Sequence, residues 1–301
     1  MAPRGHKPSL NDERCTVKAS ELLTCPAITV GPGETVQEAS LKMEQTGIRH
    51  LPVVDGTGAV VGMLSDRDIL TGGNPVVAGG DRNEERRNQE RRVDQLMSQP
   101  VRTIRSDVDL DQIVELMIMH RISALPVVDD GELKGMLTKT NLMRWFLEFC
   151  RANPTLTAAT YTVRHCMQHN VLTVQPGDSS SVAIQKMAAA GVQHVPVVQG
   201  PKLEGIVSDR DVRKHLGLSI NSIHRLQYEP SERELNTPVR GIMTANPTTI
   251  EPAARMSLAT ETMLENRFSA LPVVFDGALA GIVTETDVIR LVRSLVLTTV
   301  A

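Results

Sequence analysis

One pattern of apolar and polar positions occurs four times along this chain. The most similar part of the first copy is GIRHLPVVDGTGAVVGMLSDRDIL. The corresponding segments of the other three copies are RISALPVVDDGELKGMLTKTNLM, GVQHVPVVQGPKLEGIVSDRDVR and RFSALPVVFDGALAGIVTETDVI. The prolines that align these copies are separated by 74, 70 and 76 residues, and they are Pro52, Pro126, Pro196 and Pro272. Such regular self-similarity predicts four related structural units, each longer than the usual solenoid repeat.

Within each copy the hydrophobic spacing predicts the order strand, helix, strand, strand, helix. In the first copy a short apolar run, AITV, precedes a segment with helical spacing of apolar residues over 36–43. Thr35-Val-Gln-Glu38 has the spelling of a capping box, and Gly47 is a suitable end for this helix. Two β-branched runs joined by an Asp-Gly connection predict a hairpin, and a second helix is expected to begin at Ser65.

The four copies divide the chain into repeats and connectors. A unit of about 55 to 60 residues is near the lower limit for a self-sufficient core, so the repeats are expected to pair. Repeats 1 and 3 have a Gly and a His before the aligned proline and end in Ser-Asp-Arg-Asp, whereas repeats 2 and 4 have Arg-x-Ser-Ala there and open their last helix with Thr. This alternation indicates duplication of an existing pair. We therefore expect an α/β (α+β) fold of four βαββα units arranged as two pseudo-twofold pairs. The expected boundaries are a polar N-terminal tail 1–15, repeat 1 at 16–73, a charged linker 74–92, repeat 2 at 93–150, an inter-module linker 151–162, repeat 3 at 163–216, a linker 217–237 and repeat 4 at 238–298.

Composition narrows the classes of function. Lys plus Arg total 32 against 35 for Asp plus Glu, so the chain lacks the basic excess of a general nucleic-acid binder. No run approaches the roughly 18 apolar residues of a membrane span, and the N-terminus has no signal-like apolar region, which predicts a cytoplasmic protein without membrane association.

The four cysteines lack zinc-site spacing. The sequence also has no phosphate loop, nucleophile elbow, dinucleotide fingerprint or HExxH spelling, so we expect no enzymatic activity, no catalytic residues and no metal.

The turn from the last strand into the second helix contains the most informative chemistry. A Ser or Thr hydroxyl opens the helix beside unpaired backbone N–H groups, a position that suits a phosphate. Three residues later a carboxylate can accept hydrogen bonds from two vicinal ribose hydroxyls. This spacing is also nearly that of a capping box, so a purely structural role is an alternative. The pairs are Ser65 with Asp68, Ser208 with Asp211, Thr284 with Asp287, and Thr138 with Asn141, where an amide replaces the carboxylate.

With these residues the repeat resembles the cystathionine-β-synthase (CBS) domain family, whose tandem pairs are called Bateman modules. The resemblance extends from about Thr16 to Leu297. It implies a regulatory fold that commonly binds adenosine nucleotides in the cleft between paired domains, although the fold alone does not fix the ligand. It also implies that the first-strand threonines border the purine, for which strand propensity is the alternative explanation. These threonines are Thr29, Thr103, Thr173 and Thr249.

An anionic ligand also needs cations near the cleft. The expected cationic groups are Arg49, His50 and Arg67 in repeat 1, and His194, Arg210 and Arg213 in repeat 3. Repeats 2 and 4 instead have Ser123-Ala124 and Ser269-Ala270 at the corresponding positions. Phosphate binding is therefore predicted to be asymmetric within each module, and a histidine that titrates near neutrality would make it sensitive to pH.

A glycine precedes the cap hydroxyl by three residues in every repeat. Glycine inside a β-run indicates a close approach by a ligand or by a neighbouring element, and the sequence leaves both open. These positions are Gly62, Gly135, Gly205 and Gly281.

These observations favour a stand-alone regulatory protein that binds adenine nucleotides and signals their occupancy to a protein target through changed packing or oligomerisation. AMP, ADP and ATP are the main ligand candidates, with S-adenosylmethionine and cyclic dinucleotides as further ones. The two modules could close into a disc, or the chain could form a homodimer. One alternative function is a ligand-independent scaffold that forms an oligomer. Another, less favoured, is nucleic-acid binding through the arm 82–92, where basic and acidic residues alternate.

Overall fold

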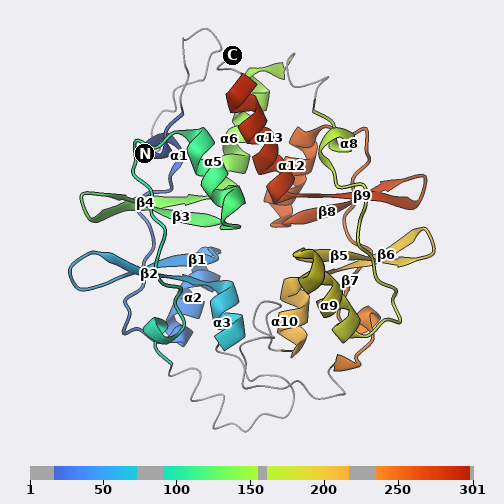
Figure 1. The fold of residues 1–301 in the computed structure, drawn as a ribbon, viewed down its shortest axis with the longest axis horizontal. Coiled ribbons are helices and arrows are strands. Elements are labelled where there is room, and N and C mark those ends of the chain that lie inside the picture. The colour runs from blue at the N-terminus through green and yellow to red at the C-terminus, as the bar shows by residue number, and fades with distance from the viewer. Residues whose placement is uncertain (1–16, 73–90, 155–160, 217–234, 299–301) are drawn as a thin grey trace.

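The computed structural model describes residues 17–72, 91–154, 161–216 and 235–298. Viewed down its shortest axis, the molecule has repeats 1 and 2 on one side and repeats 3 and 4 on the other (Figure 1). The helices converge toward the middle and the β-hairpins extend toward the rim (Figure 1). The N-terminal tail and nearly all of the arm 82–92 lie outside the described residues.

Each repeat contains a helix, a β-hairpin and a second helix in the predicted order. The first helices are α2 (Val36–Thr46), α5 (Leu110–Met119), α9 (Ser180–Ala190) and α12 (Met256–Asn266). The hairpins are β1 (His50–Val54) with β2 (Val60–Ser65), β3 (Ala124–Asp129) with β4 (Glu132–Thr138), β5 (His194–Gln199) with β6 (Lys202–Ser208), and β8 (Ala270–Phe275) with β9 (Ala278–Thr284). The second helices are α3 (Asp66–Gly72), α6 (Lys139–Ala152), α10 (Asp209–Leu216) and α13 (Glu285–Thr298).

The caps of α2 confirm the sequence-based prediction. The Thr35 hydroxyl accepts a hydrogen bond from the backbone N–H of Glu38, and the Glu38 carboxylate accepts one from the Thr35 backbone N–H at 2.8 Å. Gly47 ends the helix with a φ of 69°, in the left-handed region where a side chain is unfavourable. The local sequence alone therefore sets both ends of this helix.

The first strand of each repeat is shorter than predicted. One apolar residue of the run forms an isolated parallel bridge with the hairpin, such as Val30 with Val53. The Val54 backbone N–H donates to the Val30 carbonyl at 2.9 Å. A turn follows directly, closed by a hydrogen bond from Glu34 N–H to the Gly31 carbonyl, so pairing stops after one residue. The other bridges are Ile104 with Val127, Val174 with Val197, and Ile250 with Val273.

A short segment before each first strand, called here the lead-in, packs on the other repeat of its pair. In the first module Thr24 of lead-in 1 bridges to Met136 in repeat 2, while Ser98 of lead-in 2 bridges to Met63 in repeat 1. The second module repeats this exchange through the pairs Gln168–Ile282 and Thr244–Ile206. The lead-ins contain α1 (Ala19–Leu22), η1 (Val93–Gln95), α8 (Val163–Cys166), η2 (Val239–Gly241) and β7 (Thr244–Ala245). Each pair is therefore interlocked, as the small size of one repeat led us to expect.

The exchanged lead-ins explain the repeated glycines. A Cβ on Gly135 would lie 2.6 Å from the Thr24 carbonyl oxygen, and one on Gly281 would lie 2.8 Å from that of Gln168. At Gly135, Gly205 and Gly281 glycine is required because the lead-in backbone crosses the hairpin at contact distance, and at Gly62 the space is filled by the Met97 side chain of lead-in 2. Of the two explanations that the sequence left open, the structure shows the neighbouring element.

The two modules share one apolar core. Helix α13 packs on α5 and α6, and α12 also packs on α6. Leu142 and Phe146 of α6, Met117 of α5 and Val292 of α13 are all fully buried in this cluster, which joins repeats 2 and 4. Repeats 1 and 3 keep separate, smaller cores. Because a fully buried side chain of this size contributes about 1.5 to 3 kcal/mol, the shared core holds the two modules together mainly through repeats 2 and 4.

Diagonal contacts between modules use the position that ends the first helix. Repeats 2 and 4 have Arg121 and Arg267 there, both in the left-handed region with φ values of 53° and 56°. A Cβ on Gly191 would lie 2.8 Å from Nη1 of Arg121, and one on Gly47 would lie 2.9 Å from Nη1 of Arg267. The alternation of glycine and arginine in the sequence therefore matches a contact from repeat 2 to repeat 3 and another from repeat 4 to repeat 1.

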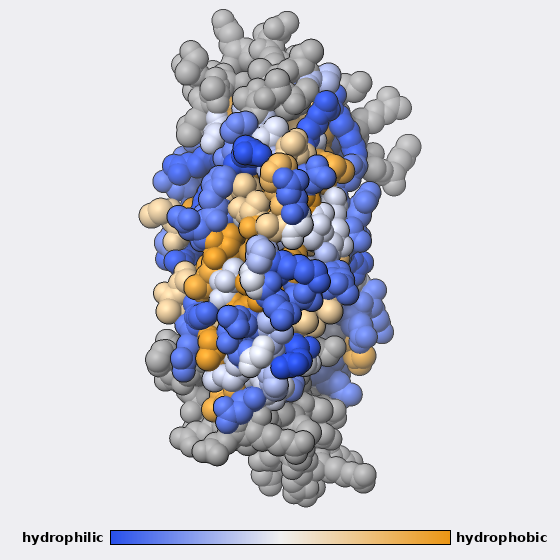
Figure 2. All heavy atoms as spheres, turned by 90° about the vertical axis from the view of Figure 1, so that its right-hand side faces the viewer, coloured by the Kyte–Doolittle hydropathy of each residue, from blue (hydrophilic) through white to orange (hydrophobic). Residues whose placement is uncertain are grey.

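The outer face of repeats 3 and 4 is mainly hydrophilic, with apolar side chains between the polar ones (Figure 2). Among the helices of the described ranges, none combines the length and the apolar character needed to cross a membrane.

Candidate functional site

A cavity of about 470 Å³ lies where the second helices of all four repeats begin. Every repeat contributes polar side chains to its wall, among them Arg67, Lys139, Arg210 and Thr284. The lining contains six Arg or Lys residues and four Asp or Glu residues, so the excess of basic groups favours an anionic ligand.

The structure brings many, though not all, of the predicted site residues to this cavity. Those that line it are Arg49, His50, Arg67, Ser123, His194, Ser208, Arg210, Ser269, Thr284 and Asp287. Those outside its lining are Thr29, Ser65, Asp68, Thr103, Thr138, Asn141, Thr173, Asp211 and Thr249. The cavity thus gathers all the predicted cationic side chains except that of Arg213, which lies outside the described part of the structure. It contains only two of the four cap hydroxyls, Ser208 and Thr284, and most of the residues predicted to contact sugar or base lie farther out.

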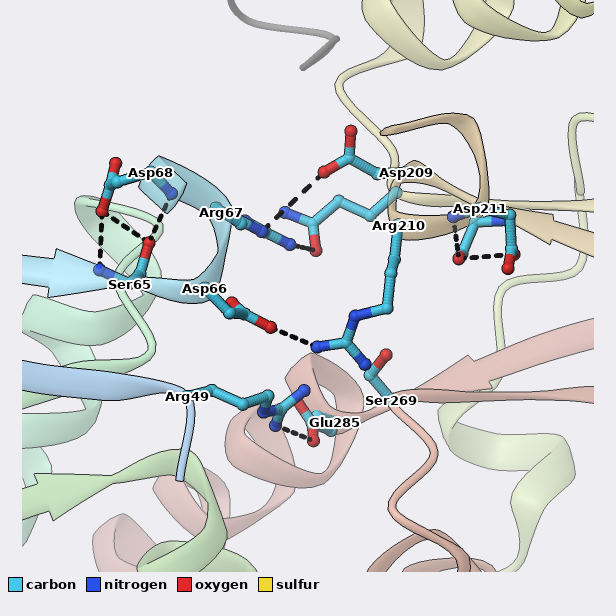
Figure 3. A network of polar contacts seen from close by, with 12 residues as sticks. Arg49, Ser65, Asp66, Arg67, Asp68, Asp209, Arg210, Asp211, Ser269 and Glu285 are labelled. Carbon is cyan, nitrogen blue, oxygen red and sulfur yellow. Dashed lines mark hydrogen bonds and ion pairs between the residues drawn. The ribbon is translucent and has the colours of Figure 1, made fainter. Parts of the chain in front are cut away.

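The starts of α3 and α10 face each other across the cavity and exchange ion pairs (Figure 3). Arg210 of repeat 3 pairs with Asp66 of repeat 1. In the opposite direction, Nε of Arg67 lies 3.8 Å from Asp209, and its Nη2 donates to Gln193. The Ser-Asp-Arg-Asp motif therefore pairs with its own copy in the other module.

Repeat 4 takes part in the same network through Glu285. Its carboxylate lies 3.5 Å from Nη2 of Arg49 in repeat 1. Nζ of Lys139 in repeat 2 donates to the Thr286 hydroxyl at 3.1 Å. Burial lowers the pKa of Lys139, with Glu285 opposing that shift. All four repeats are thus connected by polar contacts at the cavity.

Sequence reasoning missed the acidic half of this network. Asp66 and Asp209 stand inside the quoted motif, and Glu285 and Lys139 occupy the equivalent position in repeats 4 and 2. The residue after each cap hydroxyl is charged in every repeat, and this regularity was the available signal.

In repeats 1 and 3 the cap aspartate uses one carboxylate oxygen to start the helix. Oδ2 of Asp68 accepts from the Ser65 backbone N–H at 2.7 Å and from its hydroxyl at 2.6 Å. Oδ2 of Asp211 accepts from Ser208 in the same way, at 2.8 and 2.6 Å. Within the described part of the chain, no hydrogen bond reaches Oδ1 of either residue. The capping role is therefore present, and it leaves one oxygen of each carboxylate available.

Repeats 2 and 4 differ from this arrangement. Oδ1 of Asn141 caps α6 by accepting from the Thr138 backbone N–H at 2.9 Å, and its amide donates to the Thr24 hydroxyl at 2.9 Å. Asp287 caps α13 through Oδ2, but its Oδ1 also accepts hydrogen bonds from Gln168 and Arg290, both at 3.0 Å. Four similar sequences therefore give three kinds of site.

The two histidines of the cavity wall are half-buried and have pKa values well below neutrality. Burial lowers the pKa of His50 to about 4, and it lowers that of His194 to about 4, with nearby arginines adding to the effect. Nε2 of His194 also lies 2.9 Å from the Ser269 hydroxyl. A pH-sensitive affinity near neutrality required a histidine that titrates there, and the desolvation of His50 and His194 lowers both pKa values below that range.

The first-strand threonines of repeats 1 and 3 differ in burial from those of repeats 2 and 4. Thr29 and Thr173 are half-buried, and their carbonyls accept hydrogen bonds from Lys42 and Lys186 of the following helix, at 3.3 and 2.8 Å. Thr103 and Thr249 are exposed. Repeats 1 and 3 thus share one local structure around the predicted purine position.

Comparison with known proteins identifies relatives along nearly the whole chain. Protein MJ1225 of Methanocaldococcus jannaschii is 27% identical over 275 residues, which cover 87% of this chain and 94% of that protein. Its crystal structure, described as a proposed archaeal homologue of g-AMPK, matches with a TM-score of 0.69 and 25% identity, covering 91% of this chain and 99% of the other. A 33.4 kDa protein from the ribosomal RNA operon of Thermofilum pendens is 27% identical, over 88% of this chain and 87% of its own.

The fold is also that of a conserved protein from Pyrococcus horikoshii, at 19% identity and a TM-score of 0.59, covering 92% of this chain and 100% of the other. The model of the CBS domain matches four segments, 19–72, 93–148, 163–218 and 239–294, which coincide with the four repeats and make up most of the sequence. The chain therefore belongs to the CBS domain family, and its repeats form two tandem Bateman modules.

Proposed function

We propose that this protein is a regulatory sensor that binds adenine nucleotides in repeats 1 and 3. In each of these repeats the proposed cleft is the space beside the cap aspartate, Asp68 or Asp211, and the phosphates extend from it into the central cavity. The observation that supports this most is the available Oδ1 of Asp68 and of Asp211, each beside a cavity wall that contains arginine. Figure 3 shows these two carboxylates on opposite sides of the ion-pair network. A nucleotide would bridge the two features, with its ribose on the carboxylate and its phosphates among the arginines.

The spacing of each motif supports this assignment. Asp68 follows Arg67 directly, and Asp211 follows Arg210 directly. A ribose hydroxyl that donates to a carboxylate forms a charge-assisted hydrogen bond, and a phosphate accepts similar bonds from a guanidinium. One short segment therefore offers both partners that a nucleoside phosphate requires.

The ion pairs between modules suggest how occupancy becomes a signal. A phosphate in the cavity competes with Asp66 for Arg210 and with Asp209 for Arg67. The Arg210–Asp66 pair is the more exposed of the two, with side chains 52% and 25% exposed, and exposed ion pairs contribute only about 0 to 1 kcal/mol. The Arg67 side chain is 43% exposed, although its partner Asp209 is buried. A bound phosphate can therefore exchange them and change how repeats 1 and 3 contact each other. A protein target or a changed oligomeric state would detect that difference.

The relatives support the same class of ligand. MJ1225 covers nearly the whole chain and is described as a proposed homologue of g-AMPK, the γ subunit of AMP-activated kinase. We extend this to the present chain as an adenosine ligand of the AMP, ADP or ATP type.

The proposal is tested by isothermal titration of the whole chain with AMP, ADP and ATP, comparing wild type with Asp68→Asn/Asp211→Asn. Asparagine keeps the cap, as Asn141 caps α6, but removes the charge. Hydrogen bonds to charged groups contribute about 1.5 to 3 kcal/mol each, so the double variant should bind at least tenfold more weakly. Asp107→Asn is the matched control, because Asp107 is a surface carboxylate paired with Arg105 and outside the cavity lining.

Two results would contradict the proposal. One is the absence of heat with all three nucleotides, which would favour a ligand-independent scaffold. The other is unchanged affinity in the double variant, which would exclude Asp68 and Asp211 from the binding site.

A further inference from the structure

The cap aspartate of repeat 4 is the one carboxylate of the three that is satisfied by the described protein itself. Asp287 is 4% exposed, and both of its oxygens accept hydrogen bonds. Gln168 and Arg290 hold Oδ1, the oxygen that is available in Asp68 and Asp211. A ribose in this cleft would have to displace two existing partners.

One of the two donors to Oδ1 of Asp287 is Gln168, a lead-in residue that has an equivalent in each of the other three repeats. In each lead-in the backbone of one residue bridges to the residue five positions before the cap residue of the other repeat, so these four lead-in residues are equivalent. Three lead-ins have a short hydroxyl residue at this position and the fourth has glutamine. By this register the lead-in residues correspond to the cap residues as Thr24 to Asn141, Ser98 to Asp68, Thr244 to Asp211, and Gln168 to Asp287. The side chains of Thr24 and Gln168 form hydrogen bonds with their cap residues.

Side-chain length explains the difference. The Ser98 backbone N–H donates to the Met63 carbonyl at 2.8 Å, and the Gln168 backbone N–H donates to the Ile282 carbonyl at 2.8 Å, so the two backbones are held alike. Only the glutamine adds an amide that reaches the carboxylate, at 3.0 Å. Glutamine NH₂ groups donate as ribose hydroxyls do, and Gln168 therefore occupies the place of the sugar.

The charges around the repeat 4 cleft also differ from those in repeats 1 and 3. Thr286 stands where the other two repeats have Arg67 and Arg210, so the arginine adjacent to the cap aspartate is absent there. The acidic residue after the cap hydroxyl is common to the three repeats, as Asp66, Asp209 and Glu285, and the arginine beside Asp287, Arg290, is already paired with that carboxylate. A phosphate is consequently less favoured beside Asp287 than beside Asp68 or Asp211.

We infer that Gln168 closes the repeat 4 cleft, so that one chain binds two nucleotides, in repeats 1 and 3, and no third one beside Asp287. This inference rests on the proposed function, since it concerns the number and choice of its sites. Gln168 is then a specificity-determining residue that acts by occupying the site.

Exchanging the lead-in residues tests the inference. Equilibrium dialysis with AMP on the whole chain should give two sites in wild type, and Asp287→Asn should leave both number and affinity unchanged. Gln168→Thr, which introduces the residue found at Thr24 and Thr244, should add a third, weaker site. Arg290 also donates to Oδ1 of Asp287 and could keep that oxygen occupied after Gln168 is replaced. The double variant Gln168→Thr/Arg290→Ala removes both donors and should therefore also show the third site. The reciprocal change, Thr244→Gln, should close the Asp211 cleft and leave one site.

The outcomes separate this inference from the proposed function. Three sites in wild type, one of them lost in Asp287→Asn, would overturn the closure by Gln168 and leave the proposed function intact. Unchanged numbers of sites in Thr244→Gln and in both Gln168 variants would also overturn it. No AMP binding by wild type would contradict the proposed function, and this inference with it. Circular dichroism of each variant confirms that it is folded.

Discussion

At the scale of single residues, one carboxylate can serve the fold and a ligand together, because it has two oxygens. Asp68 and Asp211 each start a helix with Oδ2 and keep Oδ1 available, whereas Asp287 has no oxygen left. The sequence predicted the hydroxyl and carboxylate pairs from their spacing, which is a local property. It could not predict that Asp287 is satisfied, because Gln168 is separated from it by 119 residues.

The half-buried histidines give the protein a pH dependence of stability. The pKa of His50 and of His194 is about 4, below the value of 6.5 for an unperturbed histidine. The unfolded chain therefore binds more protons between these two values, and stability falls as the pH is lowered. The contribution is complete above pH 6.5 and is lost progressively toward pH 4.

Thermal unfolding at about pH 7.5 and about pH 5 measures this effect, and the loss at pH 5 should be on the order of 2 kcal/mol per histidine. The double variant His50→Gln/His194→Gln keeps every carboxylate but should show a flatter dependence. An equally steep dependence in that variant would assign the loss to other groups.

At the scale of elements, local signals predicted the helices and hairpins well and failed for contacts between repeats. The capping box and Gly47 gave both ends of α2 from neighbouring residues alone. The first strand was overpredicted, since its apolar run was visible but the turn that ends pairing was not recognised. The exchange of lead-ins was not predicted. Its one sequence signal was the repeated glycine in each hairpin, which lies against the lead-in of the other repeat of the pair.

Replacing one of these glycines should destabilise the interlocked pair. In Gly135→Ala the new Cβ would meet the backbone carbonyl of Thr24 at 2.6 Å, and a backbone atom cannot move aside cheaply. Overpacking of this kind costs on the order of 1 to 3 kcal/mol. Gly56→Ala is the matched control, because a Cβ at Gly56 has no heavy atom within 4 Å among the described residues. Urea unfolding of both variants measures the difference, and equal stability would contradict the tight crossing.

At the scale of the whole molecule, two modules of one chain enclose a central cavity. The shared core of repeats 2 and 4 supplies the permanent contact, and the exchangeable ion pairs of repeats 1 and 3 lie on the other side of the cavity. This division gives the molecule one fixed interface and one that a ligand can alter. The alternation of repeat types in the sequence predicted two pairs, but a closed disc and a homodimer were equally compatible with it.

The central claim is that nucleotide phosphates enter this cavity and compete with the carboxylates for arginine. The most direct measurement is a crystal structure of the whole chain grown with saturating AMP. We predict AMP in the clefts of repeats 1 and 3, with ribose hydroxyls on Oδ1 of Asp68 and Asp211 and with Arg67 and Arg210 turned from Asp209 and Asp66 toward phosphate. Empty clefts with these ion pairs unchanged, or AMP bound away from both aspartates, would contradict the account.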